Sequence, residues 1–369
     1  MGIKAGLVGL PNVGKSTLFN ALTKSSIPAE NYPFCTIDPH VAITEVPDTR
    51  LDQFLQVYGS QKKIPATVTF VDIAGLVKGA ASGEGLGNQF LSHIREVDLL
   101  LHVLRCFEDP NIIHQSEVDP VDDYEVIFHE LMLKDLESVN KRLERLPRDI
   151  KGAQGKPEQA QMLASELALL TKIKQALDDG DGETARNHMK TATVPMLPLL
   201  STKQFLIIAN VAEDELDGNA FEQNKHFQAL VKKFGKQNII PVSAKAESEL
   251  TQLSDEEAAE IMGMLGLQER GVDAIIRATY THLGLITFFT CGPKEAHAWP
   301  IIKGISIRKA AGEIHSDLER GFICADVFNA ADLFKAGSEA ALRDTGKLRR
   351  EGQEYIVQDG DVVNIKFNV

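Results

Sequence analysis

The chain has 369 residues, of which 43% are hydrophobic and 25% charged, and its formal net charge is −13 at pH 7. These fractions are typical of a globular protein with about two or three domains, and the longest apolar runs are much too short to span a membrane. The acidic balance disfavours broad binding to nucleic acid, so we expect no DNA partner and only local contacts with RNA.

The first predicted element is an apolar strand over residues 3–8, which begins without any segment that resembles a secretion signal. The four cysteines lie far apart in the sequence and show neither a C-x-x-C pair nor zinc-binding spacing, which indicates reduced thiols. Both observations lead us to expect a cytoplasmic protein with no membrane partner.

A glycine-containing loop follows this strand and leads into a predicted helix. The loop reads GLPNVGKS from Gly9 to Ser16, which matches G-x-x-x-x-G-K-S between a strand and a helix. Backbone N–H groups of such a loop surround phosphate oxygens, and the N-terminus of the helix favours the same anion. Lys15 should reach the β- and γ-phosphates, and Ser16 should coordinate Mg²⁺. The predicted phosphate-binding residues are Asn12, Val13, Gly14, Lys15, Ser16 and Thr17.

Two further segments supply predicted ligands for the same magnesium ion. A strand over 66–71 ends in Asp72-Ile-Ala-Gly75, the D-x-x-G arrangement in which Asp72 holds Mg²⁺ through water and the Gly75 amide faces the γ-phosphate. Upstream, NYPFCTIDP places Thr36 to give Mg²⁺ a second hydroxyl. Four glycines between 79 and 87 indicate a segment that changes shape when the γ-phosphate leaves. The predicted metal ligands are Ser16, Thr36 and Asp72.

The residue that usually orients the attacking water is missing. Leu76 follows Gly75 at the position where a hydrolytic glutamine is expected, and it cannot donate a hydrogen bond. His114 lies in the loop EDPNIIHQSEVDP after a predicted strand over 99–104. With an ordinary pKa near ~6.5, it could position or polarise water. From the residues alone, a solvated histidine without a role is the simpler interpretation.

An insertion over 120–200 has the periodicity of two helices. Apolar residues recur every three or four positions from Phe128 to Leu146 and again from Leu163 to Leu177, which predicts an antiparallel pair. PRDIKGAQGKP, residues 147–157, is predicted to turn the chain between them. Residues 141–156 contain six basic and two acidic side chains. This excess suits a contact with phosphate backbone, and it equally suits a solvated helix tip.

The base-reading loop lacks two guanine-specific residues. A strand over 205–209 ends in Asn210-Val-Ala-Glu213, where a guanine-reading loop would have Asn-Lys-x-Asp. An Asp there accepts hydrogen bonds from both N1–H and the N2 amine of guanine, and Glu213 is one methylene too long for that pose. Val211 replaces the lysine that lies across the base, and the Asn210 amide is a candidate partner of the purine N7/N6 edge.

A second loop keeps a guanine-type motif. PVSAK places Ser243 and Ala244 where a backbone N–H commonly faces the 6-oxo group of guanine. An unmatched donor costs only ~1–3 kcal/mol and side chains can shift, so the residues alone leave both ATP and GTP open, with ATP favoured.

The last part of the sequence, 283–369, alternates strand-like runs with a helical stretch. From residue 285 it contains 11 basic and 12 acidic side chains, so its overall charge does not mark an RNA-binding domain. A protein-docking module is therefore an open alternative. The candidate RNA contacts in this part are Arg308, Lys309, Lys347, Arg349 and Arg350.

Four stretches of the sequence resemble the Obg-like NTPases, specifically the YchF subfamily of ribosome-associated ATPases: GLPNVGKSTLFNALT, NYPFCTIDP, DIAGLVKGAASGEGLGNQFLSHIREVD and DGDVVNIKFNV. The resemblance covers essentially the whole chain. It implies an α/β fold with a P-loop, Ras-like nucleotide-binding domain over 1–120 and 200–282. It further implies an inserted antiparallel α-helical hairpin (coiled coil) over 121–199 and a C-terminal TGS domain with a β-grasp fold over 283–369.

The resemblance also implies functional details. It favours ATP over GTP, because members of the subfamily share the N-x-x-E pattern of residues 210–213. Their catalytic histidine matches His114, which would act with Lys15 and Gly75. Asn12 matches a residue that helps to coordinate K⁺ in similar NTPases without the glutamine. The ribosome or ribosomal RNA becomes the expected partner.

The sequence thus predicts a slow, Mg²⁺-dependent ATPase that serves as a nucleotide-regulated switch on the ribosome, in translation or stress response. The alternative is an adaptor that binds the ribosome, RNA or a protein, in which ATP or GTP mainly stabilises the fold or regulates docking.

Overall fold

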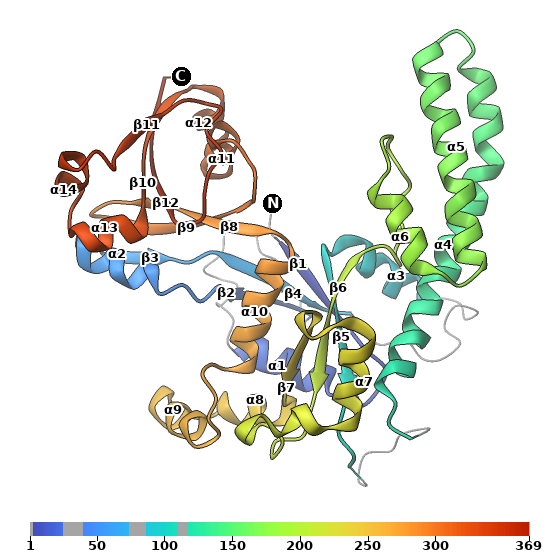
Figure 1. Cartoon of the computed structure of the whole chain (residues 1–369), viewed down its shortest axis with the longest axis horizontal. Coiled ribbons are helices and arrows are strands. Elements are labelled where there is room, and N and C mark those ends of the chain that lie inside the picture. Colours follow the sequence, from blue (N-terminus) through green and yellow to red (C-terminus); the bar gives the residue numbers. More distant parts are fainter. Residues whose placement is uncertain (1–2, 25–39, 74–85, 110–116, 369) are drawn as a thin grey trace.

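The computed structural model describes residues 3–24, 40–73, 86–109 and 117–368. They form two six-stranded sheets and a long helical hairpin (Figure 1). Figure 1 shows the hairpin projecting from one side of the first sheet and the second sheet lying on the other side. Within this described part, no helix is long and apolar enough to cross a membrane.

The first sheet has the strand order β2-β4-β1-β5-β6-β7. Its strands are β1 (Lys4–Val8), β2 (Val41–Glu45), β4 (Thr67–Asp72), β5 (Leu99–Arg105), β6 (Gln204–Asn210) and β7 (Ile239–Val242). All neighbours are parallel except β2 and β4. Because every residue of the central strand β5 is buried, its sequence is a continuous apolar run with few polar residues. The carboxyl ends of five parallel strands therefore meet at one edge, where ligands bind in such sheets.

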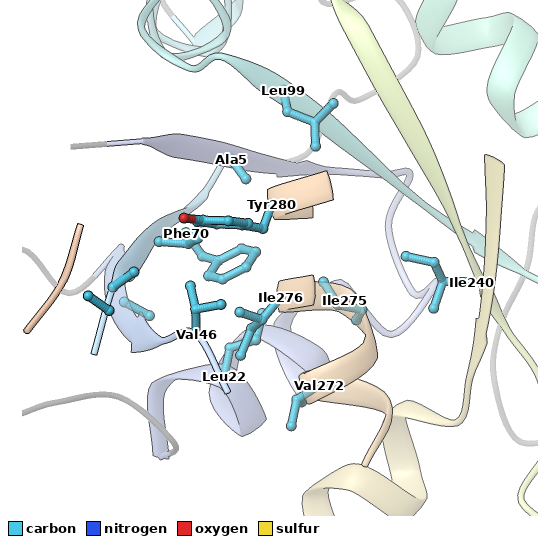
Figure 2. Packing of buried hydrophobic residues seen from close by; sticks show 14 of the residues in the cluster. Ala5, Leu22, Val46, Phe70, Leu99, Ile240, Val272, Ile275, Ile276 and Tyr280 are labelled. Atoms are coloured by element: carbon cyan, nitrogen blue, oxygen red, sulfur yellow. The ribbon is translucent and has the colours of Figure 1, made fainter. Parts of the chain in front are cut away.

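Helices cover both faces of this sheet. One face packs on α1 (Lys15–Lys24), α8 (Ala244–Leu250) and α10 (Gly271–His282), and Figure 2 shows Leu22 of α1 and Ile276 of α10 in one layer with Phe70 of β4. The opposite face packs on α3 (Leu86–Glu96), on the start of α4 and on α7 (Lys225–Phe234). The other elements of this half are α9 (Asp255–Met264) and the short 3-10 helices η3 (Asp217–Gln223) and η4 (Lys236–Asn238).

The insertion consists of α4 (Pro120–Gly152), α5 (Pro157–Asp178) and α6 (Gly182–Lys190). Asp119 caps the start of α4 by accepting hydrogen bonds from two backbone N–H groups. The α4–α5 seam holds the predicted apolar residues together with a bidentate pair between Arg142 and Glu166, whose two N–O distances are both 2.7 Å. The antiparallel hairpin is thus confirmed.

One boundary of the hairpin was wrongly predicted. The turn was expected to begin at Pro147, yet α4 continues through Pro147 to Gly152. A proline within a helix removes one backbone hydrogen bond and does not always end the helix. The chain turns only over residues 153–156.

The second sheet has the order β11-β10-β12-β8-β9-β3. Its strands are β8 (Leu285–Cys291), β9 (Glu295–Ile302), β10 (Phe322–Asn329), β11 (Arg349–Glu351), β12 (Asp361–Phe367) and β3 (Lys62–Ile64), and it packs with α11 (Ile307–Ile314), α12 (Ser316–Arg320), α13 (Ala330–Ala336) and α14 (Glu339–Asp344). The strand β3 comes from the N-terminal half of the chain and pairs in parallel with β9.

The segment that carries β3 also provides α2 (Arg50–Tyr58), which packs beside the second sheet. Phe54 is fully buried, and its ring centroid lies 4.9 Å from those of Phe289 and Phe334. Arg50 donates a hydrogen bond of 2.7 Å to Asp359. The chain between β2 and β4 therefore leaves the first sheet, adds a strand to the second and returns to end in Asp72.

Candidate nucleotide site

The phosphate loop has the backbone conformation that its sequence requires. It runs from the end of β1 to the start of α1, with Gly14 at φ 93° and Asn12 at φ 65°. A Cβ atom at Gly14 would lie 2.3 Å from Nδ2 of Asn210, so both the positive φ and the close approach demand glycine here. Val13 is fully buried, whereas Ser16 and Thr17 are exposed at the start of α1. The exposed N–H groups of this helix start can face an anion.

Lys15 and Asp72 contact each other through Nζ and Oδ1. Their side chains are only 10% and 14% exposed. The contact arises because β1 and β4 are parallel neighbours, with Leu7 opposite Asp72 in the register. The structure thus brings together Lys15 and Asp72, two residues that the sequence predicted in one site, and Ser16 follows Lys15 at the start of α1.

The donor set suits magnesium. Ser16 offers a hydroxyl and Asp72 a carboxylate, and Mg²⁺ prefers such oxygen ligands while retaining several waters. Three predicted site residues lie outside the described residues: Thr36, Gly75 and His114.

Asn210 ends β6 and joins three loops. Its Nδ2 donates to the backbone carbonyl of Val13 at 2.8 Å, and its Oδ1 accepts from the backbone N–H of Ala244 at 2.9 Å. The residue is 4% exposed. Its main structural role is therefore to hold the phosphate loop against the loop after β7. Among the described residues, no hydrogen bond engages the second N–H of the amide, and the expected contact with the purine edge stays a prediction.

A cavity of about 480 Å³ opens beside Asn210. Four of the predicted nucleotide-binding residues line it, namely Asn210, Val211, Glu213 and Ser243. The sequence did not indicate the remaining lining residues, which are Phe107, Glu108, Asp109, Ala212, Asp214, Lys245 and Leu265. Phe107 to Asp109 come one residue after β5, and their position just beyond a buried strand was the only local signal.

The predicted base-reading side chains that line the cavity already have partners within the protein. Glu213 accepts a hydrogen bond of 2.8 Å from Nζ of Lys245, and this bond raises the pKa of the lysine. Val211 is 1% exposed and packs into the core below β6, so it offers a base little surface. The Ser243 hydroxyl caps α8 at the N–H of Ala246. Glu213 therefore does not offer the free carboxylate that guanine recognition needs.

The basic surfaces differ in how far their charges are paired. In the C-terminal part, Lys347 and Arg350 bind Asp332 and Asp326 at 2.5 and 3.0 Å. At the hairpin tip, only Arg142 is engaged, by Glu166 and Asp149. The other five tip cations have exposed side chains without an ion pair or side-chain hydrogen bond among the described residues: Lys141, Arg145, Arg148, Lys151 and Lys156.

Comparisons with known proteins agree along the whole chain. The family model described as a 50S ribosome-binding GTPase matches residues 4–142, and the model of the YchF GTPase C-terminal part, described as a protein of unknown function, matches residues 285–368.

Several curated relatives match at full length. The chain is 46% identical to "Ribosome-binding ATPase YchF" of Bacillus subtilis and 45% identical to the protein of that name in Escherichia coli O157:H7, and each alignment covers 100% of both chains. It is 43% identical to "Obg-like ATPase 1" of Oryza sativa subsp. japonica, over 100% of this chain and 92% of the relative. The solved structure of the Schizosaccharomyces pombe YchF GTPase superposes with a TM-score of 0.83 at 37% identity, covering 99% of this chain and 98% of that one.

Proposed function

Because the chain belongs to the family of YchF and Obg-like ATPases, we propose that it is a Mg²⁺-dependent P-loop ATPase that binds the ribosome. The observation that carries this proposal is the contact between Lys15 and Asp72 together with a cavity lined by the base-reading loops, to which the phosphate loop is tied by the bond from Asn210 to Val13. Phosphate, metal and base sites then lie at one edge of the first sheet, as in other nucleotide-binding α/β proteins.

The preference for ATP rests on the cavity rim. The relatives from Bacillus and Escherichia are named ATPases, whereas the Schizosaccharomyces protein of known structure is named a GTPase, so the names do not decide the base. Guanine needs a carboxylate that accepts from N1–H and N2 together. The Glu213 carboxylate is bound to Lys245 in a largely exposed pair, so guanine would have to compete with that lysine, at a modest cost in binding. Adenine makes no such demand, so GTP should bind more weakly.

In hydrolysis, Lys15 would balance charge on the β- and γ-phosphates. Mg²⁺ would be held by Ser16, Thr36 and Asp72. The ion would stabilise the charge that develops on the transferred phosphoryl group. The backbone N–H of Gly75 would face the γ-phosphate, and His114 would position the attacking water. K⁺ beside Asn12 would add positive charge to the same phosphates. We expect slow turnover, because a histidine on a separate loop replaces the glutamine of faster switches.

The ribosome contact is best assigned to the hairpin tip. Its five exposed cations, which have no ionic partner among the described residues, can displace counterions from RNA phosphates. In the C-terminal part, Lys347, Arg349 and Arg350 are each paired with a neighbouring carboxylate. A ribosome-binding protein acts where ribosomes are, so a cytoplasmic location follows from this part of the proposal.

We also propose the domain division 1–120 with 200–282, 121–199 and 283–369. The hairpin and the second sheet each have a hydrophobic cluster of their own, which supports it. The strand β3 crosses this division, because residues of the first domain complete the sheet of the third.

The proposal is tested by phosphate release from MgATP and MgGTP, with and without K⁺ and ribosomes. Lys15→Ala should abolish release, and His114→Ala should lower turnover with little change in ATP affinity. If His114→Ala lost hydrolysis but left ribosome binding with an unchanged response to ATP, the adaptor alternative would be correct instead. Unchanged turnover in His114→Ala would exclude that histidine from the mechanism.

A further inference from the structure

Arg105 is a charged side chain buried at the edge of the nucleotide site. It is the last residue of β5, lies opposite Asn210 in the β5–β6 register and is only 2% exposed. Buried arginines are ordinarily paired with a carboxylate. Within the described residues, Arg105 forms no ion pair with an acid.

The guanidinium group of Arg105 binds the turn that follows its own strand. Nε donates to the carbonyl of Phe107 at 2.9 Å, and Nη2 donates to the carbonyl of Asp109 at 3.3 Å. The guanidinium carbon lies 4.8 Å from the centroid of the Phe107 ring. One planar group therefore holds both the backbone of the turn and the face of its aromatic side chain.

This turn forms one wall of the base cavity, since Phe107, Glu108 and Asp109 all line it. Asn210, on the neighbouring strand, holds the phosphate loop and the loop after β7 by the same kind of contact, a buried side chain bonded to loop backbone. The cavity is thus built on two adjacent strand ends, each fixed by its final residue. Of these two final residues, Asn210 is the one whose side chain bonds to the phosphate loop.

We propose that Arg105 is a positioning residue for the nucleoside part of the substrate. It holds Phe107 and the 107–109 turn in place before ligand binding, so its contribution appears in affinity for the base and ribose and not in affinity for the triphosphate. The inference depends on the proposed function, because it assumes that the cavity receives the base.

Arg105→Lys retains the charge but loses the fork that reaches two carbonyls at once and the flat surface over the ring. We expect the dissociation constant for MgATP to rise about tenfold, because hydrogen bonds from a charged donor are lost. Affinity for inorganic tripolyphosphate with Mg²⁺ should stay unchanged. In turnover, KM should rise while kcat stays constant.

Calorimetry on the full chain with both ligands provides the test. The matched control is Arg142→Lys, which changes an arginine of the hairpin seam that is also bonded through its guanidinium, and it should alter neither affinity. If Arg105→Lys lowered the affinities for ATP and tripolyphosphate equally, Arg105 would only stabilise the fold and the proposal would be wrong. Unchanged ATP affinity would also refute its role. Failure of the unsubstituted chain to bind ATP would instead refute the proposed function.

A second variant keeps the test decisive if Arg105→Lys folds poorly. Phe107→Leu removes the ring but leaves the carbonyl that Arg105 binds. It should lower the affinity for ATP without lowering the affinity for tripolyphosphate. Where Arg105→Lys does fold, it should cost less ATP affinity in the Phe107→Leu background than it costs alone. Unchanged ATP affinity in Phe107→Leu, or fully additive losses, would overturn the proposal.

Discussion

The side-chain amide of Asn210 donates a hydrogen bond of 2.8 Å to the backbone carbonyl of Val13, so the end of β6 holds a loop 197 residues earlier in the sequence. Asn210→Ala would leave this carbonyl and the N–H of Ala244 without their partner in a buried site. We expect unfolding free energy to fall by about 1–3 kcal/mol, and ATP affinity to fall with it. Urea unfolding and calorimetry measure both.

The control for this prediction is Asn187→Ala, at an exposed position of α6. It should change stability by less than about 0.5 kcal/mol. If Asn210→Ala kept its affinity for ATP, the bridge between the two loops would have no function in binding.

Gly14 is predicted to be irreplaceable for two separate reasons, its φ of 93° and the 2.3 Å that would separate a Cβ atom at this position from Nδ2 of Asn210. Gly14→Ala should destabilise the chain by about 1–3 kcal/mol through strain and abolish measurable ATP binding. Gly155→Ala is the matched control, because open space surrounds Gly155 in the hairpin turn. Thermal unfolding of both variants, followed by ATP titration, distinguishes them. A Gly14→Ala chain that still bound ATP would contradict the loop geometry described above.

His102 should make stability depend on pH. Burial, and next the positive charge of Arg186, lowers its pKa from 6.5 to about 3. As the pH falls, the folded chain keeps the imidazole neutral while the unfolded chain takes up a proton, which favours unfolding. The free energy of unfolding is therefore unaffected by His102 above about pH 6.5 and decreases as the pH falls from 6.5 toward 3. His102→Phe can keep the packing against Tyr124 and Phe205.

In urea unfolding at pH 7, 5 and 4, the free energy of unfolding should therefore decrease less with falling pH in His102→Phe than in the unsubstituted chain. His129→Gln changes a histidine whose side chain is 57% exposed, and it should leave the pH dependence as it is. Identical acid profiles for all three chains would mean that His102 is not held neutral.

The hairpin tip is predicted to dominate electrostatic attraction to the ribosome. Changing Arg145, Arg148 and Lys151 to Glu should weaken association and make it less sensitive to salt, with the slope of log K against log salt falling by roughly one for each lost phosphate contact. The same change at three C-terminal cations, Lys347, Arg349 and Arg350, should have a smaller effect. Ribosome co-sedimentation at several salt concentrations provides the measurement, and the reverse order of effects would move the contact to the second sheet.

Much of the fold could be predicted from local patterns, since the phosphate loop, the buried strands and the hairpin each have a short-range signal. The membership of β3 in the second sheet could not be predicted from the sequence. This strand has only three residues, and its partner β9 lies more than 200 residues further along the chain. Phe107 and Arg105 escaped notice for a similar reason. Nothing in their own stretch shows that β5 lies beside β6, and only that neighbourhood places them at the cavity.

The choice of base could be predicted from the sequence only in part. Val211 and Glu213 were identified because they differ from the residues of a guanine-reading loop. This difference argues against GTP more strongly than it argues for ATP. The side chains that surround the cavity decide the rest, and the pairing of Glu213 with Lys245 depends on two loops that meet only in the folded chain.

The edge formed by the ends of β1, β4 and β6 is predicted to bind a nucleoside triphosphate with a preference for adenine. Calorimetric titration of the full chain with MgATP and MgGTP, alongside the Lys15→Ala variant, tests it most directly. We predict tighter binding of ATP than of GTP by the unsubstituted chain, and binding of neither by Lys15→Ala. Tighter binding of GTP, or no heat from either nucleotide with well-folded protein, would contradict the account.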